Sequence, residues 1–548
     1  MLLTPTPPPF DALEWEKKPF PEKVRLMCQA WALQGYGSPV GALALYALKV
    51  AFYIGVWCFF VGFTPGLGAI SSFTHWVFEP IAFQKAILWS MLFEGLGLGC
   101  GSGPLTGRYY PPIGGVLYFL RPGTTKRPLL EGVPLIGGHR RNLLDVALYA
   151  ANVGCLLRAL LAPSLGASEL VPIAVLVPLL GILDRTLFLA ARAEHYYTTL
   201  LCFVLATDWI PGAKAVQLAL WFWAGVSKLN RHFPAVVCVM MSNSPVMRFQ
   251  WFRRRMYRQF PDDLRPSRLA TTMAHMGATL EFLVPTVLAL GSGDTVTMVG
   301  ILLMLGLHGF ITSSVPMGVP IEWNFMVVYG GLFLFGEKAA VSIFSGGSIP
   351  LSIVLVLALI IVPTIGNFFP RLISFLLSMR YYAGNWAYTV WLFRGDSYQK
   401  LEKLTKSSPW VYDQLARFYD RRTSVGLFGK VVAFRAMHLH GRALQELLPK
   451  AVDRIEDYEY VEGEVIAGLA LGWNFGDGHL HDEGLLRAIQ AQCDFEEGEL
   501  RCIFVESQPL FGSSIRWRIA DAKTGQRDEG SITIDALEAR QPWPASVA

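Results

Sequence analysis

The sequence predicts an all-α polytopic membrane helix bundle with about ten transmembrane helices, followed by a small α+β C-terminal domain. Of the 548 residues, 53% are hydrophobic and only 16% are charged, whereas roughly one quarter of a soluble domain is charged. Apolar stretches long enough to cross a bilayer recur up to about residue 380, and beyond 395 the composition becomes that of a soluble domain. These observations indicate an integral membrane protein.

The predicted organisation has three parts. Residues 1–40 form an N-terminal interfacial segment, 41–380 the transmembrane bundle, and 395–548 a soluble, membrane-associated C-terminal domain. A spanning helix needs about 20 apolar residues. By that criterion the predicted spans are 43–64, 82–99, 142–163, 170–191, 195–210, 213–229, 269–291, 297–316, 323–343 and 349–378.

The loops between these spans alternate in basic content. The loops 121–141 and 230–268 are rich in Lys and Arg, as is the N-terminus, whereas 65–81, 164–169 and 292–296 have none. Basic loops remain on the cytoplasmic side of a membrane, so the N-terminus is predicted to be cytoplasmic. An even number of spans returns the C-terminus to the same side.

The C-terminal domain is predicted to combine helices at 398–420 and 434–455 with later strands. The runs "LRCIFVE" and "SIRWRIA" alternate as strands do, and "DAKTGQRDEG" between them is typical of a turn. The histidines of "MHLHGR" and "GDGHLHDE" lack a fixed ligand spacing, so no metal site is predicted. The net charge of +5 is small for this length and gives no reason to expect a nucleic-acid partner.

Ionisable residues within the apolar spans are the first candidates for function, because a charge in lipid is costly and usually faces the bundle interior. Lys228 ends the sixth predicted span and His195 begins the fifth. The short turn "DWIPGAKA" between these spans returns the chain to the same membrane level, so the two side chains can share one pocket. The alternative is that Lys228 extends to lipid headgroups and His195 caps a helix.

Further polar residues lie in later spans. Glu281 and His308 stand near the middle of two consecutive spans and can hydrogen-bond to each other, either for proton handling or to tie two helices together. The cluster Glu322, Trp323 and Asn324 follows two prolines, which fits a polar cavity or an interfacial helix start. Asp184 and Arg185 are expected to make structural pairings with other helices.

Three short motifs carry a family resemblance. "LWFWAGVSKLN" at 220–230 resembles the AGxxKL signature of the vitamin K-dependent gamma-carboxylases and their bacterial relatives, the horizontally transferred transmembrane domain proteins. "EHYYTTLL" is similar to that family's His-x-Tyr segment, and "LHGFITSSVPMGVPIEWNFMVV" to its later His and aromatic segment. The rest of the chain looks more like an uncharacterised actinobacterial transmembrane family.

The resemblance implies a bacterial inner-membrane enzyme that acts on a quinone or lipid-like substrate. Lys228 would deprotonate a reduced naphthoquinone, His195 would assist, and His308 would support them. Ser227 stands where the animal enzymes have a second lysine, Glu194 replaces a polar amide, and the C-terminal domain is short, so peptide carboxylation is not predicted. The alternative is a non-enzymatic lipid-binding, transport or scaffold protein. Membrane lipids are the expected partners in either case.

Overall fold

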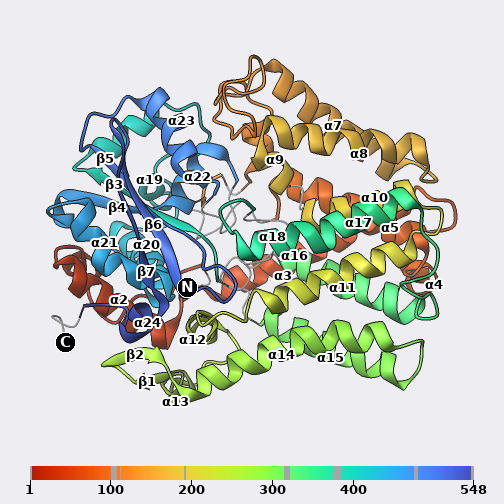
Figure 1. Cartoon of the computed structure of the whole chain (residues 1–548), viewed down its shortest axis with the longest axis horizontal. Coiled ribbons are helices and arrows are strands. Elements are labelled where there is room, and N and C mark those ends of the chain that lie inside the picture. The colour runs from red at the N-terminus through yellow and green to blue at the C-terminus, as the bar shows by residue number, and fades with distance from the viewer. Residues whose placement is uncertain are drawn as a thin grey trace.

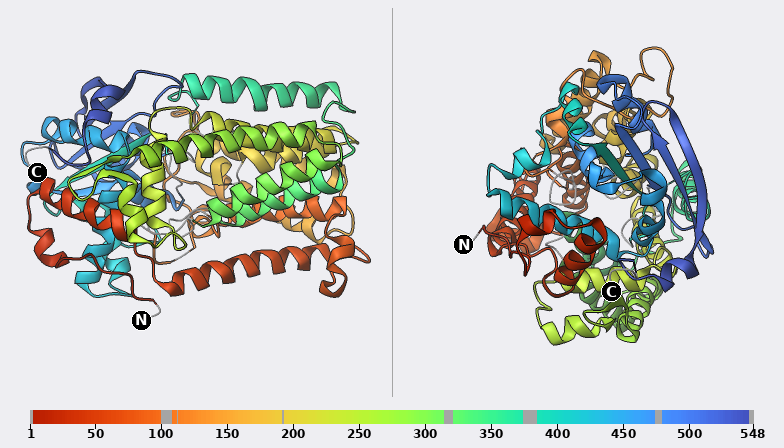
Figure 2. Two further views of the ribbon diagram at one scale, coloured as in Figure 1. Left: turned by 90° about the horizontal axis from the view of Figure 1, so that it is seen from below. Right: turned by 90° about the vertical axis from the view of Figure 1, so that its left-hand side faces the viewer.

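The computed structural model describes residues 3–99, 108–111, 113–190, 193–313, 321–373, 384–473 and 479–544. A bundle of long helices occupies one end of the molecule, and a sheet covered by shorter helices occupies the other (Figure 1). Both ends of the chain lie at the sheet end, as the two further views also show (Figure 2). The bundle helices run lengthwise away from this domain, so one end of every long helix lies near the seam between the two parts.

The described residues of each predicted span include helical segments, but the number of membrane spans is not confirmed. Residues 191, 314–316 and 374–378 of these spans lie outside the described residues. Five helices are long and apolar enough to cross a membrane by length and composition: α3 (Val40–Val61), α7 (Leu143–Leu161), α14 (Arg268–Leu290), α15 (Thr295–Thr312) and the continuous helix Ile349–Phe368 that contains α17 (Ile349–Val356) and α18 (Val362–Phe368). The other predicted spans correspond to shorter or interrupted helices: α5 (Pro80–Gly95), α8 (Ala167–Leu183), α9 (Arg185–Ala190), α10 (Thr198–Leu205), α11 (Ile210–Val226) and α16 (Ile321–Gly331).

The interior of the bundle is packed by aromatic rings. Phe83 of α5 stacks on Phe333, with 4.7 Å between ring centroids, and on Trp209, with 5.8 Å between centroids. Trp223 of α11 donates its indole N–H to the carbonyl of Leu359 at 2.8 Å. Large rings contribute both buried apolar area and defined stacking geometry, so these contacts fix how the short helices pack against the long ones.

The C-terminal domain is built on one antiparallel sheet in the order β4-β3-β5-β6-β7. Its strands are β3 (Tyr388–Arg394), β4 (Tyr458–Glu462), β5 (Leu500–Val505), β6 (Ser514–Asp521) and β7 (Gly525–Thr533). The two predicted strands are therefore present as β5 and β6. The predicted turn is too long, because its second half forms β7, which pairs with β6 throughout.

The predicted helices of this domain are displaced along the chain. A 3-10 segment at Ser397–Lys403 and the short α19 (Val411–Leu415) occupy about half of the first one. The main helix is α20 (Arg421–Met437), which begins where the Asp420 side chain accepts a hydrogen bond from the Thr423 backbone N–H. That cap sets the helix start. A shorter helix, α21 (Leu444–Ala451), follows.

The N-terminal helices α1 (Ala12–Glu16) and α2 (Phe20–Gln34) pack on α20. Trp31 of α2 lies against Phe434, with 5.7 Å between ring centroids, and Lys430 donates to the carbonyl of Tyr36 at 3.0 Å. The first 40 residues thus contact the C-terminal domain directly. The predicted domain boundaries stay a prediction, and residue 380 is outside the described residues.

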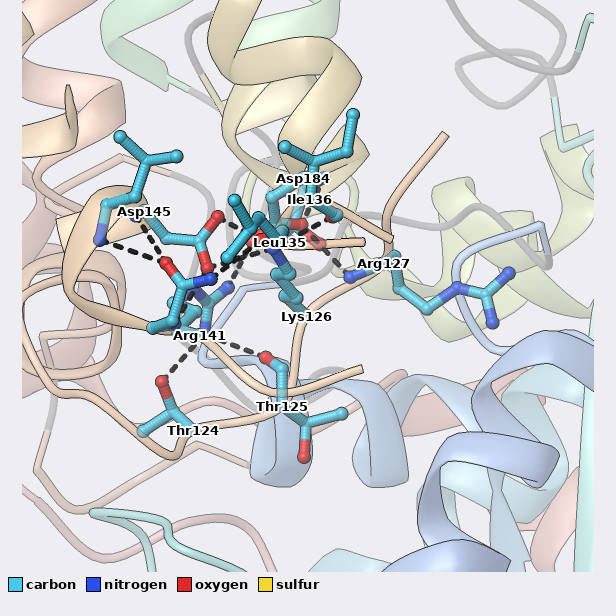
Figure 3. Close-up of polar contacts among 12 residues, drawn as sticks. Thr124, Thr125, Lys126, Arg127, Leu135, Ile136, Arg141, Asp145 and Asp184 are labelled. Atoms are coloured by element: carbon cyan, nitrogen blue, oxygen red, sulfur yellow. Dashed lines mark hydrogen bonds and ion pairs between the residues drawn. The ribbon is translucent and has the colours of Figure 1, made fainter. Parts of the chain in front are cut away.

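The basic loop 121–141 joins the bundle to the C-terminal domain through buried ion pairs (Figure 3). Lys126 Nζ lies 2.7 Å from a carboxylate oxygen of Asp145, and Arg141 lies 2.5 Å from Asp184. Arg127 extends the other way and binds Asp482 of the C-terminal domain at 2.7 Å. Asp184 therefore has the structural role that the sequence suggests, but its ion-pair partner is in this loop and not on another helix.

Glu459 gives the seam between α1 and the sheet a pH-dependent stability. Burial raises the pKa of this carboxyl group to about 7 from its ordinary 4.5, and the nearby Glu16 adds to the rise. The folded chain thus binds this proton more tightly than the unfolded chain, so the stabilisation is complete below pH 4.5 and is lost as the pH rises to 7. We expect Glu459→Gln to raise the free energy of unfolding at pH 8 by on the order of 1 kcal/mol and to change it little at pH 4.5.

Thermal unfolding of the detergent-solubilised protein at both pH values measures this effect. Glu456→Gln, at an exposed neighbouring position, is the matched control and is expected to have no effect at either pH. An equal shift of the melting temperature at pH 8 and pH 4.5 for Glu459→Gln would contradict the prediction.

Candidate functional site

Lys228 lies inside the bundle and forms an ion pair with Glu281. Its ammonium group bonds to the Glu281 carboxylate, and the two side chains are only 11% and 5% exposed. Glu281 stands near the middle of the 23-residue helix α14, so the pair lies deep along that helix. Phe233 covers the ammonium group, with 5.5 Å from Nζ to the ring centroid. These contacts do not fit a lysine that extends to lipid headgroups.

Close packing of α11 on α14 brings the two charges together. Gly225 of the "AGVSKL" motif is the reason for the close approach, because a Cβ atom there would lie 3.2 Å from the Phe282 ring. Phe282 follows Glu281 in sequence, so the same helix contact places Glu281 beside Lys228. The small residue in the motif and the lysine three residues later therefore act together.

His308 is held in a hydrogen-bond chain that crosses three helices. The indole N–H of Trp221 on α11 donates to His308 Nε2 at 2.9 Å. Because an indole nitrogen can only donate, Nε2 is the acceptor, and Nδ1 carries the proton that bonds to Asn324 Oδ1 at 2.5 Å. The Asn324 amide donates to the His308 carbonyl at 3.1 Å and to Thr312 Oγ1. The predicted hydrogen bond between Glu281 and His308 is not formed, because Glu281 bonds to Lys228 and both ring nitrogens of His308 bond to other residues.

His195 lies in the π-helical segment Ala193–Tyr197, between α9 and α10, and is 2% exposed. Its ring contacts Trp323 edge-on, with 6.3 Å between centroids. In the described part of the chain, no hydrogen bond or ion pair joins His195 to Lys228, which contacts Glu281, Phe233 and the Ala224 carbonyl. The predicted shared pocket of the two residues therefore has no direct polar contact between them among the described residues.

Glu322 belongs to a second intramembrane ion pair. Its carboxylate lies 3.1 Å from the ammonium group of Lys49, which also donates to the Gly99 carbonyl at 3.0 Å. Glu322 is 1% exposed, and Lys49 stands in the middle of α3. The consecutive residues Glu322, Trp323 and Asn324 of α16 thus contact Lys49, His195 and His308 in turn, so this short segment connects the polar groups of the bundle.

Two members of this network were not among the sequence candidates. In the sequence, Trp221 is indistinguishable from the other aromatic residues of its apolar span. Only the structure shows that it bonds to His308. Lys49 is a lone charge within 22 mainly apolar residues, the same signal that singled out Lys228. Lys214 is a further buried lysine, and it donates to the carbonyls of Ala339 and Val341.

The C-terminal histidines are engaged in other contacts. His479 lies 3.0 Å from Glu506, and His481 Nδ1 lies 2.7 Å from Thr389 Oγ1. Burial of His438 among apolar groups lowers its pKa to about 3, although its bond to the Phe434 carbonyl opposes this. No group of three or more metal-ligating side chains occurs among the described residues.

The apolar helices indicate a transmembrane protein, and a small sheet region stands near its C-terminus. A family model described as a transmembrane protein of unknown function (DUF3556) matches residues 1–547. The chain belongs to this family. No curated protein and no solved structure matches the chain.

Removing either partner of the Lys228–Glu281 pair should destabilise the protein, because it leaves one charge buried without a counter-charge. We expect Lys228→Met or Glu281→Gln to cost about 3–5 kcal/mol of unfolding free energy, and Lys228→Met/Glu281→Leu to recover most of the loss. Arg158→Gln, which breaks an exposed ion pair with Glu169, is the control and should cost at most about 1 kcal/mol. Thermal and denaturant unfolding in detergent measure these values. Equal destabilisation by the single and double variants would contradict a direct pair.

Proposed function

We propose that this protein is a membrane enzyme that acts on a quinone or lipid-like substrate through acid–base chemistry by Lys228 and His195. The gamma-carboxylase-like resemblance of the motifs around these residues is one support. The single structural observation that carries the proposal is the Lys228–Glu281 pair inside the bundle. An ionisable pair at this depth is costly to maintain and stands where a lipid-soluble substrate could reach it.

The pair has the chemistry of a proton exchanger. A lysine acts as a base only after it loses its own proton, and the Glu281 carboxylate is bonded to the ammonium group and can accept that proton directly. This transfer would leave a neutral amine on Lys228 and a carboxylic acid on Glu281. The free Nζ lone pair then accepts a hydroxyl proton from the substrate, which leaves an oxyanion on it.

The neighbouring side chains fit an aromatic substrate. Phe233 lies beside the ammonium group, and Phe222 and Phe282 pack edge-to-face with 5.6 Å between ring centroids. Phe222 is 45% exposed, so this group of rings is accessible from outside the bundle. A reduced naphthoquinone would supply the acidic hydroxyl group and the reducing electrons, while Lys228 would take the proton and the rings would stack on the quinone.

The remaining polar residues have supporting roles in this proposal. His195 would contact the substrate from the side of Trp323, opposite to Lys228. His308 would act as a positioning residue, because its two ring nitrogens hold Trp221 and Asn324 in place. The Lys49–Glu322 pair would fix the start of α16.

The competing proposal is a non-enzymatic lipid-binding, transport or scaffold protein. The saturation of the His308 chain favours it, since both ring nitrogens already have partners. Polar residues used in this way hold transmembrane helices together without any chemistry.

Turnover by matched variants separates the two proposals. Wild-type protein is expected to bind a naphthoquinone and to consume oxygen when supplied with the reduced form. Lys228→Met/Glu281→Leu, which keeps the fold, should lose at least about 100-fold in turnover, as expected for a missing general base. Lys214→Met removes a buried lysine of the same helix that contacts only carbonyls, and correctly folded protein should retain activity. Bound lipid with no turnover in the wild type, or unchanged turnover in the double variant, would reject the enzymatic proposal.

We also propose that the protein lies in a bacterial inner membrane with both termini in the cytoplasm. The basic loops support this orientation, and both ends of the chain lie at the same end of the molecule (Figure 2). Cysteine-labelling in intact cells should show that positions in the 230–268 loop and the C-terminal domain are protected from an impermeant reagent. Labelling of either region without permeabilisation would contradict the proposed orientation.

A further inference from the structure

A groove with a volume of about 740 Å³ lies at the seam between the helix bundle and the C-terminal domain. We call it the seam groove. One side is formed by the domain-facing end of α8, by α9 and by residues 371–373 after α18. The other side is formed by α23 (Glu483–Cys493) with the loop before it, and by the ends of β6 and β7. Its walls therefore come from both parts of the protein.

The bundle side of the seam groove is apolar. Pro178, Ile182, Phe188 and Leu372 are among its lining residues. They lie at helix ends that face the C-terminal domain. Leu372 is 74% exposed. This side of the groove is suited to an apolar chain that also lies in the membrane.

The domain side of the seam groove is charged, and its carboxylates are already engaged. Asp482 binds Arg127 at 2.7 Å and Glu483 binds Arg518. The third, Asp521, lies 3.6 Å from Arg501 and accepts hydrogen bonds from the backbone N–H groups of Gly498 and Lys523 at 2.8 and 2.9 Å. No lining carboxylate is therefore left without a partner.

Two lining arginines remain without a carboxylate partner in the described part of the chain, Arg185 and Arg371. The Nε atom of Arg185 is buried and makes no hydrogen bond. The charge of Arg185 acts on Asp482, but that carboxylate is already bound to Arg127. A third lining arginine, Arg487, is bound to Glu131 at 2.9 Å. The groove thus has two surplus positive charges.

We propose that the seam groove binds a lipid with an anionic phosphate headgroup. The phosphate would bind Arg185 and Arg371, and the acyl chains would lie along the apolar side. Guanidinium groups match phosphate oxygens with paired hydrogen bonds, and a phosphate monoester carries close to two negative charges, enough to neutralise both arginines. A zwitterionic headgroup carries its own positive charge and would leave them unbalanced. This inference uses none of the residues assigned to the acid–base chemistry.

Native mass spectrometry of the full-length protein in detergent tests the proposal with three probes: phosphatidic acid, phosphatidylcholine with the same acyl chains, and glycerol 3-phosphate, which has the headgroup chemistry without the chains. Wild-type protein should retain phosphatidic acid at concentrations where neither other probe binds. Arg371→Gln and Arg185→Gln should each weaken phosphatidic acid binding about tenfold or more, the effect of losing one charge-assisted hydrogen bond. Arg248→Gln, at an exposed arginine outside the groove, is the control and should bind as the wild type does.

Each other outcome overturns the proposal. Equal retention of phosphatidic acid by wild type and both groove variants would show that the arginines do not bind the headgroup. Equal retention of phosphatidylcholine would show that charge does not select the lipid. Glycerol 3-phosphate bound as tightly as phosphatidic acid would identify a site for a soluble phosphate compound and not for a lipid. Since Arg371 is exposed, its variant is expected to fold even if Arg185→Gln does not.

Discussion

A charged side chain between apolar helices needs polar partners at hydrogen-bond distance, and Glu281 supplies a counter-charge to Lys228 in the bundle. The pair fixes the end of α11 to the middle of α14. Trp221 stands two turns earlier on α11, on the same face as Lys228, and this is the face that reaches His308 on α15. The position of the Lys228–Glu281 pair therefore also affects where the hydrogen bonds of His308 with Trp221 and Asn324 can form.

The same requirement governs how the soluble domain attaches to the bundle. Lys126 and Arg141 of one basic loop are buried against Asp145 and Asp184 (Figure 3), and Arg127 of the same loop binds Asp482. Such a loop cannot move as a unit without exposing several buried charges at once. The orientation of the C-terminal domain on the bundle is thus set by charge pairing as well as by apolar packing, and the seam groove owes its two walls to that orientation.

The sequence predicted the features that depend on local pattern and missed those that depend on partners. Lys228 stood out because it is a lone charge at the end of an apolar run, but its partner Glu281 lies 53 residues later and no spacing rule connects them. Trp221 could not be told from a packing residue. Strand β3 was not predicted because nearly all its residues are buried, and a strand buried on both faces shows no alternation. The count of spans is uncertain because several helices are shorter than a bilayer requires or are interrupted by π-helical turns.

Charged residues are partnered differently at the two proposed sites, the Lys228–Glu281 pair in the bundle and the seam groove. Within the bundle, Lys228 and Lys49 each have a carboxylate partner, whereas Lys214 donates to backbone carbonyls. At the seam, Arg185 and Arg371 have no carboxylate partner among the described residues. A paired charge can exchange a proton with its partner, whereas an unpaired guanidinium keeps its proton and can only bind an anion. Chemistry on a substrate is therefore expected inside the bundle, and recognition of an anionic headgroup at the seam.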